Sequence, residues 1–396
     1  MKKIFIVSAL LLLGAIPSMA QSKIPEAKRL IQNRYRRTEI VLPQVNGYNI
    51  YKADLHVHSI FSDAHVTPME RIQEAWVDGL DIIAITEHME YRPWEKLFLQ
   101  FTKGYNADKQ PVKHINNNVI EKPADERGIL ADLNLPVELA KKSAEKYNNL
   151  LVIPGIEVTR NAVEVGHYNA LFTTDNNKIY DADPIQALRN ARAQGAIITH
   201  NHPGWSRTSC DITETEQKAY DEGLIDGVEV ANDRTFYPPI VRRCLERNLY
   251  MVAASDTHHP TTGYYKDHNV FRTMTFILAK ENTAEAIREA LLARRTLGYC
   301  GGHIIGSEEL LTDLFWASVR SKLVSEDSKG RCTYMVTNLS SIKYTLYLGK
   351  GAYDLLPFGS MTIRFNAKDG VPKDPILRVG NMWKEDNKNI RIELRD

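Results

Sequence analysis

A chain of 396 residues is longer than one average domain, although a single α/β barrel can use about 250 residues. Hydrophobic residues make up 43% of the chain, charged residues 25%, and the formal net charge is +1. This balance is ordinary for a globular protein and argues against a basic face that binds duplex nucleic acid. We therefore expect one large domain and one small one, and no stable nucleic-acid partner.

The first twenty residues have the three regions of a secretory signal peptide. Lys2 and Lys3 precede an apolar run over residues 4–16, and small residues lead up to Ala20. The run is shorter than the roughly 20 residues that a membrane span needs. We expect cleavage after Ala20, a periplasmic or secreted mature protein, and no membrane span.

The spacing of the cysteines argues against a zinc ribbon, because it includes no CxxC pair. In an oxidising compartment one or two disulfides are allowed, and buried free thiols are equally compatible with the spacing. The four residues are Cys210, Cys244, Cys300 and Cys332.

Short β-branched runs alternate with amphipathic segments from residue 50 to about 300. The expected strands cover residues 51–57, 81–86, 150–158, 168–173, 196–199, 227–231, 250–254 and 274–278. The expected helices cover residues 68–78, 137–148, 184–194, 238–247 and 283–294. Strand followed by helix, repeated about seven times, predicts a parallel sheet that closes fully or nearly into a barrel.

Two stretches depart from this alternation. Residues 90–135 are polar and contain proline, which indicates an insertion after the second strand, where a barrel carries functional loops. After about residue 305, short alternating strands are separated by Gly, Pro, Asn and Asp. We therefore expect a large domain over residues 21–305 and a small all-β domain over residues 306–396.

Most of the expected strands end in residue types that bind metals. His56 and His58 are two residues apart, which places both side chains on one face of an extended segment. Similar residues stand at the ends of later strands, namely Glu87-His88, Glu157, His167, His200-Asn201-His202 and Asp256-Thr257-His258-His259. Because parallel strands end at one rim of a barrel, these separate clusters predict one shared metal site.

The motifs as a set resemble those of a known superfamily. They are DLHVHSIFSD, AITEH, GIEV followed by His167, THNHP and SDTHH. Together they are similar to the successive motifs of the PHP (polymerase and histidinol phosphatase) superfamily, over roughly residues 50–300. The resemblance implies a distorted (β/α)7 barrel and a PHP metal-dependent hydrolase domain at residues 21–305. With the signal peptide and the β-rich tail, the chain resembles in particular the secreted PHP phosphodiesterases of the Sphingobium type.

The resemblance also implies a set of metal ligands. The first metal would be bound by His56, His58, Glu157 and Asp256, and Glu157 would bridge to a second. His167 and His202 would complete the second site, and Asp63, His88 and His258 would form the third. Ala64 stands where the family usually has Gly, and Glu87 stands for the usual Asp. The extra imidazoles of His65, His200 and His259 are expected behind the ligands or at the substrate.

Mixed His and carboxylate ligation suits zinc, manganese or iron, and leaves open whether two or three divalent ions bind. A metal pair can lower the pKa of bridging water from about 15.7 to about 7, which yields hydroxide for attack on phosphorus. We expect Asp256, His258 and Arg207 at the reaction centre, with His258 as a ligand or a proton carrier and Arg207 as a phosphate clamp. Arg160 and Arg234 are alternative clamps, and Trp205, Tyr264 and Tyr265 could contact an aromatic or sugar substituent.

These features predict a secreted metal-dependent phosphoesterase that hydrolyses a small phosphate ester, a diester in preference to a monoester. One alternative is a phosphomonoesterase of the same fold. Another is an amide or lactone hydrolase, because metal-activated hydroxide also attacks carbonyl carbon. A non-catalytic metal-binding or glycan-binding module is disfavoured, since Glu157 and Asp256 are both present. The natural substrate, the cysteine pairing and the oligomeric state are left open.

Overall fold

The computed structural model describes residues 36–94, 112–113, 129–130, 132–148, 150–261, 263–365 and 374–396. The expected signal peptide lies outside these residues, and so does most of the expected insertion at residues 90–135. Residues 37–396 form one compact unit. Within the described stretches we find no helix that combines the length and the apolar character needed to cross a membrane.

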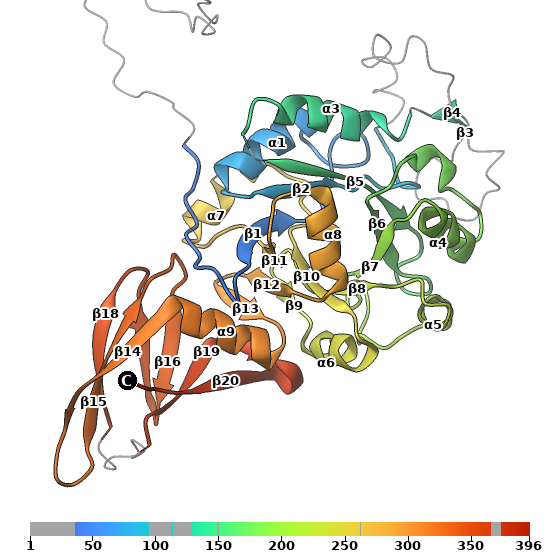
Figure 1. The fold of residues 1–396 in the computed structure, drawn as a ribbon. Coiled ribbons are helices and arrows are strands. Elements are labelled where there is room, and N and C mark those ends of the chain that lie inside the picture. Colours follow the sequence, from blue (N-terminus) through green and yellow to red (C-terminus); the bar gives the residue numbers. More distant parts are fainter. Residues whose placement is uncertain are drawn as a thin grey trace, which may run out of the picture. The chain divides into compact units, whose positions relative to one another are not determined.

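A mixed sheet forms the framework of the N-terminal part of this unit (Figure 1). Its strands are β1 (Asn49–Asp54), β2 (Ile82–Ile85), β5 (Leu151–Thr159), β6 (His167–Leu171), β7 (Ile197–Asn201), β8 (Gly227–Asn232), β10 (Tyr250–Ala254), β11 (Met274–Ala279) and β12 (Thr296–Cys300). Their hydrogen-bonded order is β10-β8-β7-β6-β5-β2-β1-β11-β12. All the expected strands are present, and β12 is an additional one.

The expectation that the sheet is parallel throughout is wrong. The neighbours β7, β8 and β10 are parallel, as are β1, β2 and β5, but β6 runs antiparallel to both β5 and β7. The reason is the short loop between Thr159 and His167, which stand opposite each other in the ladder. A connection of this length reverses the chain and leaves no room for a crossover helix. The first residue of β6 therefore lies at the same rim as the last residues of the parallel strands.

The two ends of this strand order approach each other through threonine side chains. The Met251 N–H of β10 donates to Thr296 Oγ1 at 3.2 Å, and the Ala253 N–H donates to Thr275 Oγ1 at 3.0 Å. The Thr275 hydroxyl in turn donates to the Ala253 carbonyl at 2.9 Å. In a closed barrel, backbone hydrogen bonds would join β10 to the last strands of this order. Here hydrogen bonds from threonine side chains take that position. The expected fold class, a distorted α/β barrel followed by a strand-rich region, is confirmed.

Helices cover the outside of the strands (Figure 1). They are α1 (Pro68–Val77), α3 (Leu135–Ala144), α4 (Pro184–Ala193), α5 (Glu214–Asp221), α6 (Pro238–Arg247), α7 (Tyr264–Asp267) and α8 (Ala284–Leu292). Thr67 and Glu70 form a capping box at the start of α1, and α4 and α6 begin with proline, as the sequence predicts. Ile287 and Leu291 of α8 are buried in one core cluster with strand residues such as Ile82 and Val252. The minor elements are β3 (Val112–Lys113), β4 (Ile129–Leu130), β9 (Thr235–Phe236), η2 (Asn176–Lys178) and η3 (Glu385–Asn387).

The C-terminal region is rich in strands, but the expectation that it is all-β is wrong. It contains helix α9 (Glu308–Ser318), which the Ser307 hydroxyl caps and which buries Leu311, Leu314 and Phe315. Its strands are β13 (His303–Ile305), β14 (Val319–Glu326), β15 (Cys332–Asn338), β16 (Tyr344–Leu348), β17 (Gly351–Leu355), β18 (Ser360–Phe365), β19 (Ile376–Lys384) and β20 (Lys388–Glu393).

Two sheets in this region share a core. Strands β14, β15 and β18 form one sheet, and β16, β17, β19 and β20 join the large sheet through the pairing of β13 with β12 and β19. Val336 and Ile363 from the small sheet and Leu346 and Val379 from the large one belong to a single buried cluster. This arrangement is a sandwich. The division of the chain at residue 305 stays a prediction.

All four cysteines are free thiols. Cys244, Cys300 and Cys332 are buried, and Cys210 is half-buried. Burial raises the pKa of the Cys244 thiol to about 12, so this group stays protonated near neutral pH. The sequence allowed either disulfides or free thiols, and in the structure all four cysteines are free thiols.

Candidate metal centre

The structure brings all the predicted ligands together at one rim of the barrel. They come from the segments that follow β1, β2, β7 and β10, from β5, and from the first residue of β6, namely His56, His58, Asp63, His88, Glu157, His167, His202, Asp256 and His258. Backbone bridges from Val57 to Thr257 and from His88 to Glu157 extend the strand pairing into these segments. The segments that follow the strands therefore stay extended up to the rim, and this backbone pairing positions the ligand side chains relative to one another.

Glu157 is the hub of the cluster. Its side chain is fully buried. Its carboxylate pairs with His88 and lies no more than 3.7 Å from ring nitrogens of His56, His58, His167 and His202. A carboxylate that touches imidazoles from several strands can link two neighbouring metal positions, which is the role that the sequence predicts for it.

Two aspartates organise the rest of the cluster. Asp256 Oδ1 lies 3.1 Å from His58 Nε2 and 3.3 Å from His56 Nε2. Asp63 Oδ1 lies 3.1 Å from His258 Nε2 and 3.4 Å from His88 Nε2. Asp63 thus belongs to the half of the cluster expected to form the third site, although Ala64 replaces the usual glycine beside it.

Three sets of ligand atoms are compact enough to hold a metal ion. The atoms of each set lie within 4.8 Å of one another, and the sets are His58, Asp63, His88 and His258; His56, Glu157 and His202; and His56, His58 and Asp256. The sets differ from the predicted grouping in sharing His56 and His58 and in leaving out His167. The ligand types and their convergence agree with the sequence, while the assignment of each side chain to one ion stays a prediction.

Several buried polar atoms in the cluster approach one another without a hydrogen bond, which is the arrangement expected of metal ligands. Among the described residues, no hydrogen bond reaches His56 Nε2, His58 Nε2, His167 Nδ1, Asp63 Oδ1 or Asp256 Oδ1. Each unsatisfied buried group costs about 1–3 kcal/mol, so a single instance would need explanation. Five such atoms in one cluster fit divalent cations, which bind these nitrogen and oxygen donors.

The other ring nitrogen of several imidazoles is already held. His56 Nδ1 donates to Glu229 at 2.8 Å, His167 Nε2 to the Arg160 carbonyl at 2.9 Å, and His258 Nδ1 to the Asp256 carbonyl at 2.8 Å. Such bonds fix the tautomer and leave one nitrogen of each ring for a metal. Each of these three rings can therefore bind a single ion.

Glu229 is a supporting residue that the sequence analysis missed. Its buried carboxylate accepts hydrogen bonds from His56 Nδ1, from the His202 N–H at 2.7 Å and from Asn232 Nδ2 at 2.8 Å. Asn201, also missed, donates to Glu157 Oε1 at 2.8 Å. A signal was present for Glu229, because an acidic residue inside the apolar strand β8 is rare unless it is paired. For Asn201, the only feature of the sequence that pointed to a role was its position between His200 and His202.

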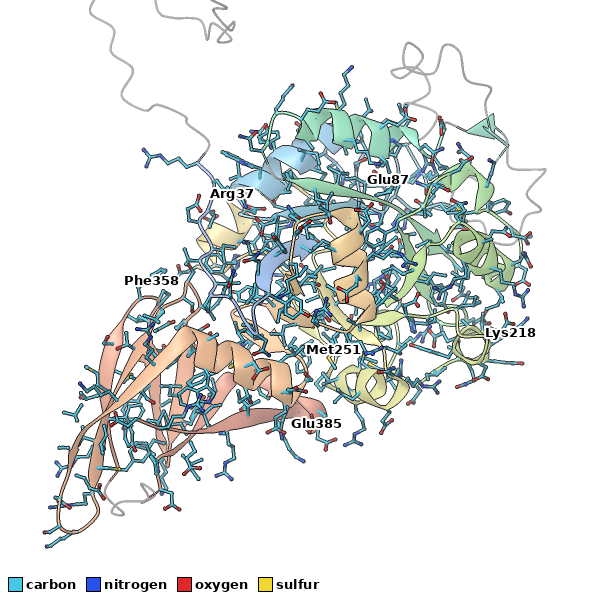
Figure 2. The ribbon with its side chains drawn as sticks, in the orientation of Figure 1. Arg37, Glu87, Lys218, Met251, Phe358 and Glu385 are labelled. Atoms are coloured by element: carbon cyan, nitrogen blue, oxygen red, sulfur yellow. The ribbon has the colours of Figure 1, made fainter. Side chains whose placement is uncertain are left out.

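Glu87 supports the loop that carries His58 and does not join the ligands. Its carboxylate accepts bonds from the Ser59 N–H at 3.0 Å, from the Ser59 hydroxyl and from the Ser62 hydroxyl at 2.6 Å. The residue is labelled in Figure 2 and is almost fully buried. Glu87 therefore lies behind the loop that carries His58, with the loop backbone and two serines as its partners.

Two ligand positions have a backbone conformation that costs energy. His202 has φ of 24° and Asp256 has φ of 48°, in the left-handed region that residues with a Cβ rarely adopt. Strain of this kind costs about 1–3 kcal/mol at each residue and collects at functional sites. Here it turns both side chains into the cluster directly after β7 and β10.

The electrostatics of the cluster differ between its imidazoles. Burial lowers the pKa of His56 and His88, but nearby carboxylates outweigh it and raise that of His56 well above its usual value and that of His88 to about 10, so these two rings must release a proton to bind metal. His58 is held neutral. Burial, together with His88 and His258, lowers the pKa of His58 to about 3. Burial raises the pKa of Glu157, but His88 and His56 outweigh it and hold that pKa well below the usual value. Because metals bind neutral imidazole and ionised carboxylate, both groups are in the form that a ligand needs near neutral pH.

The extra histidines lie away from the ligand atoms. His200 is buried, hydrogen-bonded to the Tyr220 hydroxyl at 2.9 Å and 3.0 Å from Glu216. His65 and His259 are exposed and stack on each other with ring centroids 4.9 Å apart. Their predicted exclusion from the ligand set is consistent with these contacts.

Arg207 is engaged elsewhere, which does not support its predicted role as a phosphate clamp. Its guanidinium donates to the Ala162 carbonyl at 2.7 Å and pairs with Glu216 at 2.7 Å. Arg160 is the arginine that lines the cavity over the ligands, and its guanidinium lies 3.0 Å from Glu90. Arg207 links the loop that contains Ala162 to the acidic helix α5, which contains Glu216.

An open cavity of about 510 Å³ leads to the cluster. Its walls combine the ligands Asp63, His88, His167, His202, Asp256 and His258 with Glu90, Tyr91, Arg160, Val163 and Trp205. A volume of this size admits a small organic molecule. The cluster is therefore accessible to a substrate as well as to metal ions.

Comparison with known proteins identifies the family. The PHP domain family matches residues 54–228 of the chain. A crystal structure of a two-domain protein containing a predicted PHP-like metal-dependent phosphoesterase from Bacteroides vulgatus is 33% identical, with a TM-score of 0.76, and the alignment covers 91% of this chain and 98% of that one. The chain belongs to the PHP family.

The likeness of this PHP protein to the Bacteroides structure extends into the C-terminal region, because 91% coverage requires it. An uncharacterised protein of Methanocaldococcus jannaschii is 26% identical over 122 residues, which are 31% of this chain and 54% of that relative. The PHP protein thus matches about half the length of that curated relative. The predicted PHP resemblance is confirmed, and the narrower likeness to the Sphingobium type stays a prediction.

Proposed function

We propose that this PHP protein is a secreted metal-dependent phosphoesterase that prefers phosphodiesters. The observation that carries the proposal is the set of unpartnered, buried ligand atoms at the base of an open cavity. When bound, divalent cations of this kind lower the pKa of water and polarise a phosphoryl oxygen. Manganese, zinc and iron all suit the donor set.

We assign each imidazole to one ion, in line with the tautomers seen for His56, His167 and His258. His56, His58 and Asp256 would hold the first ion and His167 and His202 the second, with Glu157 between them. Asp63, His88 and His258 would hold the third. This grouping uses no imidazole twice, whereas the compact sets of the metal-free geometry share His56 and His58.

The charge of the cavity favours a diester over a monoester. Among the described residues that line it, Arg160 is the one arginine or lysine, and its guanidinium lies 3.0 Å from Glu90, whose pKa burial raises to about 7. A phosphate monoester carries about −1.5 to −2 charges at neutral pH, and a diester carries a single one. Apart from the proposed metal ions, the described lining thus offers one cationic side chain, which matches the single charge of a diester. Phosphomonoesterase activity remains the alternative for the same site.

The test is to load the purified protein with manganese or zinc, count the bound ions, and compare bis(4-nitrophenyl) phosphate with 4-nitrophenyl phosphate. We expect two or three ions per chain and a higher kcat/KM for the diester. Glu157→Gln should lower both the ion count and the rate, because it removes the charge at the hub of the cluster. Two or three bound ions with no hydrolysis of either ester would overturn the proposal. Faster hydrolysis of the monoester would establish the alternative.

Secretion is a separate part of the proposal and rests on the N-terminal sequence pattern. Expression of the full chain in a Gram-negative host, followed by N-terminal sequencing of the periplasmic protein, should give a mature chain that begins at Gln21. Full-length protein in the cytoplasm would contradict this part and leave the chemistry untouched.

A further inference from the structure

A second cavity lies beside the first and shares part of its wall. It has a volume of about 480 Å³, close to the roughly 510 Å³ of the first. Trp205, Asp256 and His258 line both cavities. Two of these three residues are proposed metal ligands, so both cavities adjoin the proposed metal centre.

The wall of the second cavity is aromatic. Tyr237, Tyr264 and Tyr265 line it together with Trp205. The Tyr264 ring meets the Tyr265 ring edge-on with centroids 5.0 Å apart, and the Arg234 guanidinium lies 5.5 Å from the Tyr264 centroid. These contacts hold the Tyr264 ring at the wall. A planar ring fits such a surface better than an aliphatic chain, because aromatic faces stack.

One polar atom of this wall, the hydroxyl oxygen of Tyr264, makes no hydrogen bond to the described residues. The oxygen is buried and enclosed as the structure stands, so a polar atom of a ligand would reach it through a turn of the Tyr264 side chain. The second cavity thus offers a stacking surface, with one hydroxyl in its wall that makes no hydrogen bond to the described residues.

Trp205 stands where the two cavities meet. Its side chain is 54% exposed, and its indole lies 5.4 Å from the His202 ring and 5.6 Å from the His167 ring. The turn bond from the Trp205 N–H to the His202 carbonyl, at 2.8 Å, fixes its backbone to a proposed ligand. A large aromatic side chain so exposed, next to the metal centre, is placed to contact a substrate and not to fill the core.

We propose that the second cavity is the subsite for one substituent of a phosphodiester, and that this substituent is a planar aromatic ring with polar atoms. The ring would stack on Trp205, and its polar atom would bond the Tyr264 hydroxyl. The other substituent would occupy the first cavity. The proposal rests on the proposed function and deepens it, since a phosphomonoester would leave one of the two cavities unused.

The test uses three diesters that release the same 4-nitrophenolate: bis(4-nitrophenyl) phosphate, thymidine 5′-(4-nitrophenyl) phosphate and methyl 4-nitrophenyl phosphate. Stacking of a ring on an aromatic side chain is worth about 1–3 kcal/mol, or roughly 5- to 150-fold in binding. The wild type should therefore show a kcat/KM at least about 5-fold higher for the two ring diesters than for the methyl diester. The order of the two ring diesters identifies whether an aryl ring or a nucleobase suits the cavity better.

Substitutions assign the effect to the second cavity. Tyr264→Ala, which alters the second cavity alone, should lower kcat/KM by about 5-fold or more for the two diesters whose retained substituent carries a ring, mainly through KM, and leave the methyl diester within about 2-fold. Trp205→Ala alters the wall of both cavities and should lower kcat/KM for all three diesters. Tyr264→Phe keeps the ring and tests the hydroxyl alone. Tyr353→Ala, which alters an exposed tyrosine of β17, is the matched control and should change none of the rates. Metal content should be the same in all variants.

The outcomes separate the two proposals. If the metal-loaded wild type hydrolyses none of the diesters, the proposed function itself is wrong. If it hydrolyses all of them with equal kcat/KM, or if Tyr264→Ala affects ring and methyl diesters alike, the subsite proposal is wrong and the phosphodiesterase stands.

Discussion

Replacing Glu229 by glutamine tests how the metal centre is supported from behind. The carboxylate accepts three hydrogen bonds, at 2.8 Å from His56 Nδ1, 2.7 Å from the His202 N–H and 2.8 Å from Asn232 Nδ2. Glutamine has nearly the same size but only one acceptor oxygen, and its NH₂ group must face at least one of these donors. Oε1 serves His56 and Oε2 serves His202 and Asn232, so the substitution removes the acceptor of one of two proposed ligands and leaves their own metal-binding atoms unchanged.

The magnitude follows from these contacts. Substitution of a group that orients a metal ligand typically lowers metal affinity about 10- to 100-fold. At about 1.4 kcal/mol for each factor of ten, this is about 1.4–2.8 kcal/mol of binding free energy. In the metal-free protein, one buried donor without an acceptor should lower the free energy of unfolding by about 1–3 kcal/mol. Both effects have the same sign, because Glu229 holds the site with or without ions.

Competition with a chelator measures the affinity, and urea unfolding of the metal-free protein measures the stability. The matched control is Glu216→Gln, since Glu216 is also buried and lies 3.0 Å from His200, an imidazole outside the predicted ligand set. The control should lose stability and keep the metal affinity of the wild type. If Glu229→Gln binds metal as tightly as the wild type, or if both variants lose affinity equally, the assigned role of Glu229 is wrong.

Two further substitutions and the removal of metal test other parts of the structure. Asp63→Asn should lower the ion count by one, because Asp63 belongs to the proposed third site alone, beside His88 and His258; metal analysis showing no change would contradict the third site. Arg272→Leu leaves the buried Asp54, 2.8 Å away, without its charge partner and should reduce the free energy of unfolding by about 3–5 kcal/mol; a urea-measured loss below about 1 kcal/mol would refute this. A chelator should lower the Tm and manganese should restore it, because an ion that binds only the native state stabilises it. An identical Tm with and without ions would speak against a structural contribution of the metal.

The residue types of the site were predictable from local pattern. His56 and His58 share a face because an extended segment repeats every two residues, and Glu157 and Asp256 stand at the ends of apolar runs that form buried strands. The helix starts were equally visible, as Thr67 and the prolines at the starts of α4 and α6 show. These features depend on neighbours within a few residues along the chain, which a single sequence displays directly.

Contacts between distant segments were not predictable in this way. The antiparallel direction of β6 depends on the loop between Thr159 and His167 turning back beside β5. Arg207 was a plausible phosphate clamp until the fold placed Glu216 against it, and Glu229 gained its role only because β8 passes beneath His56.

The sequence by itself determined that His and carboxylate side chains gather at strand ends to bind divalent metals. Only the tertiary structure decided which carboxylates support them, which arginine faces the cavity, and that two cavities meet at Trp205. The physical reason is that ligand identity is a property of single side chains, whereas pairing, burial and cavity shape arise from residues far apart in the chain.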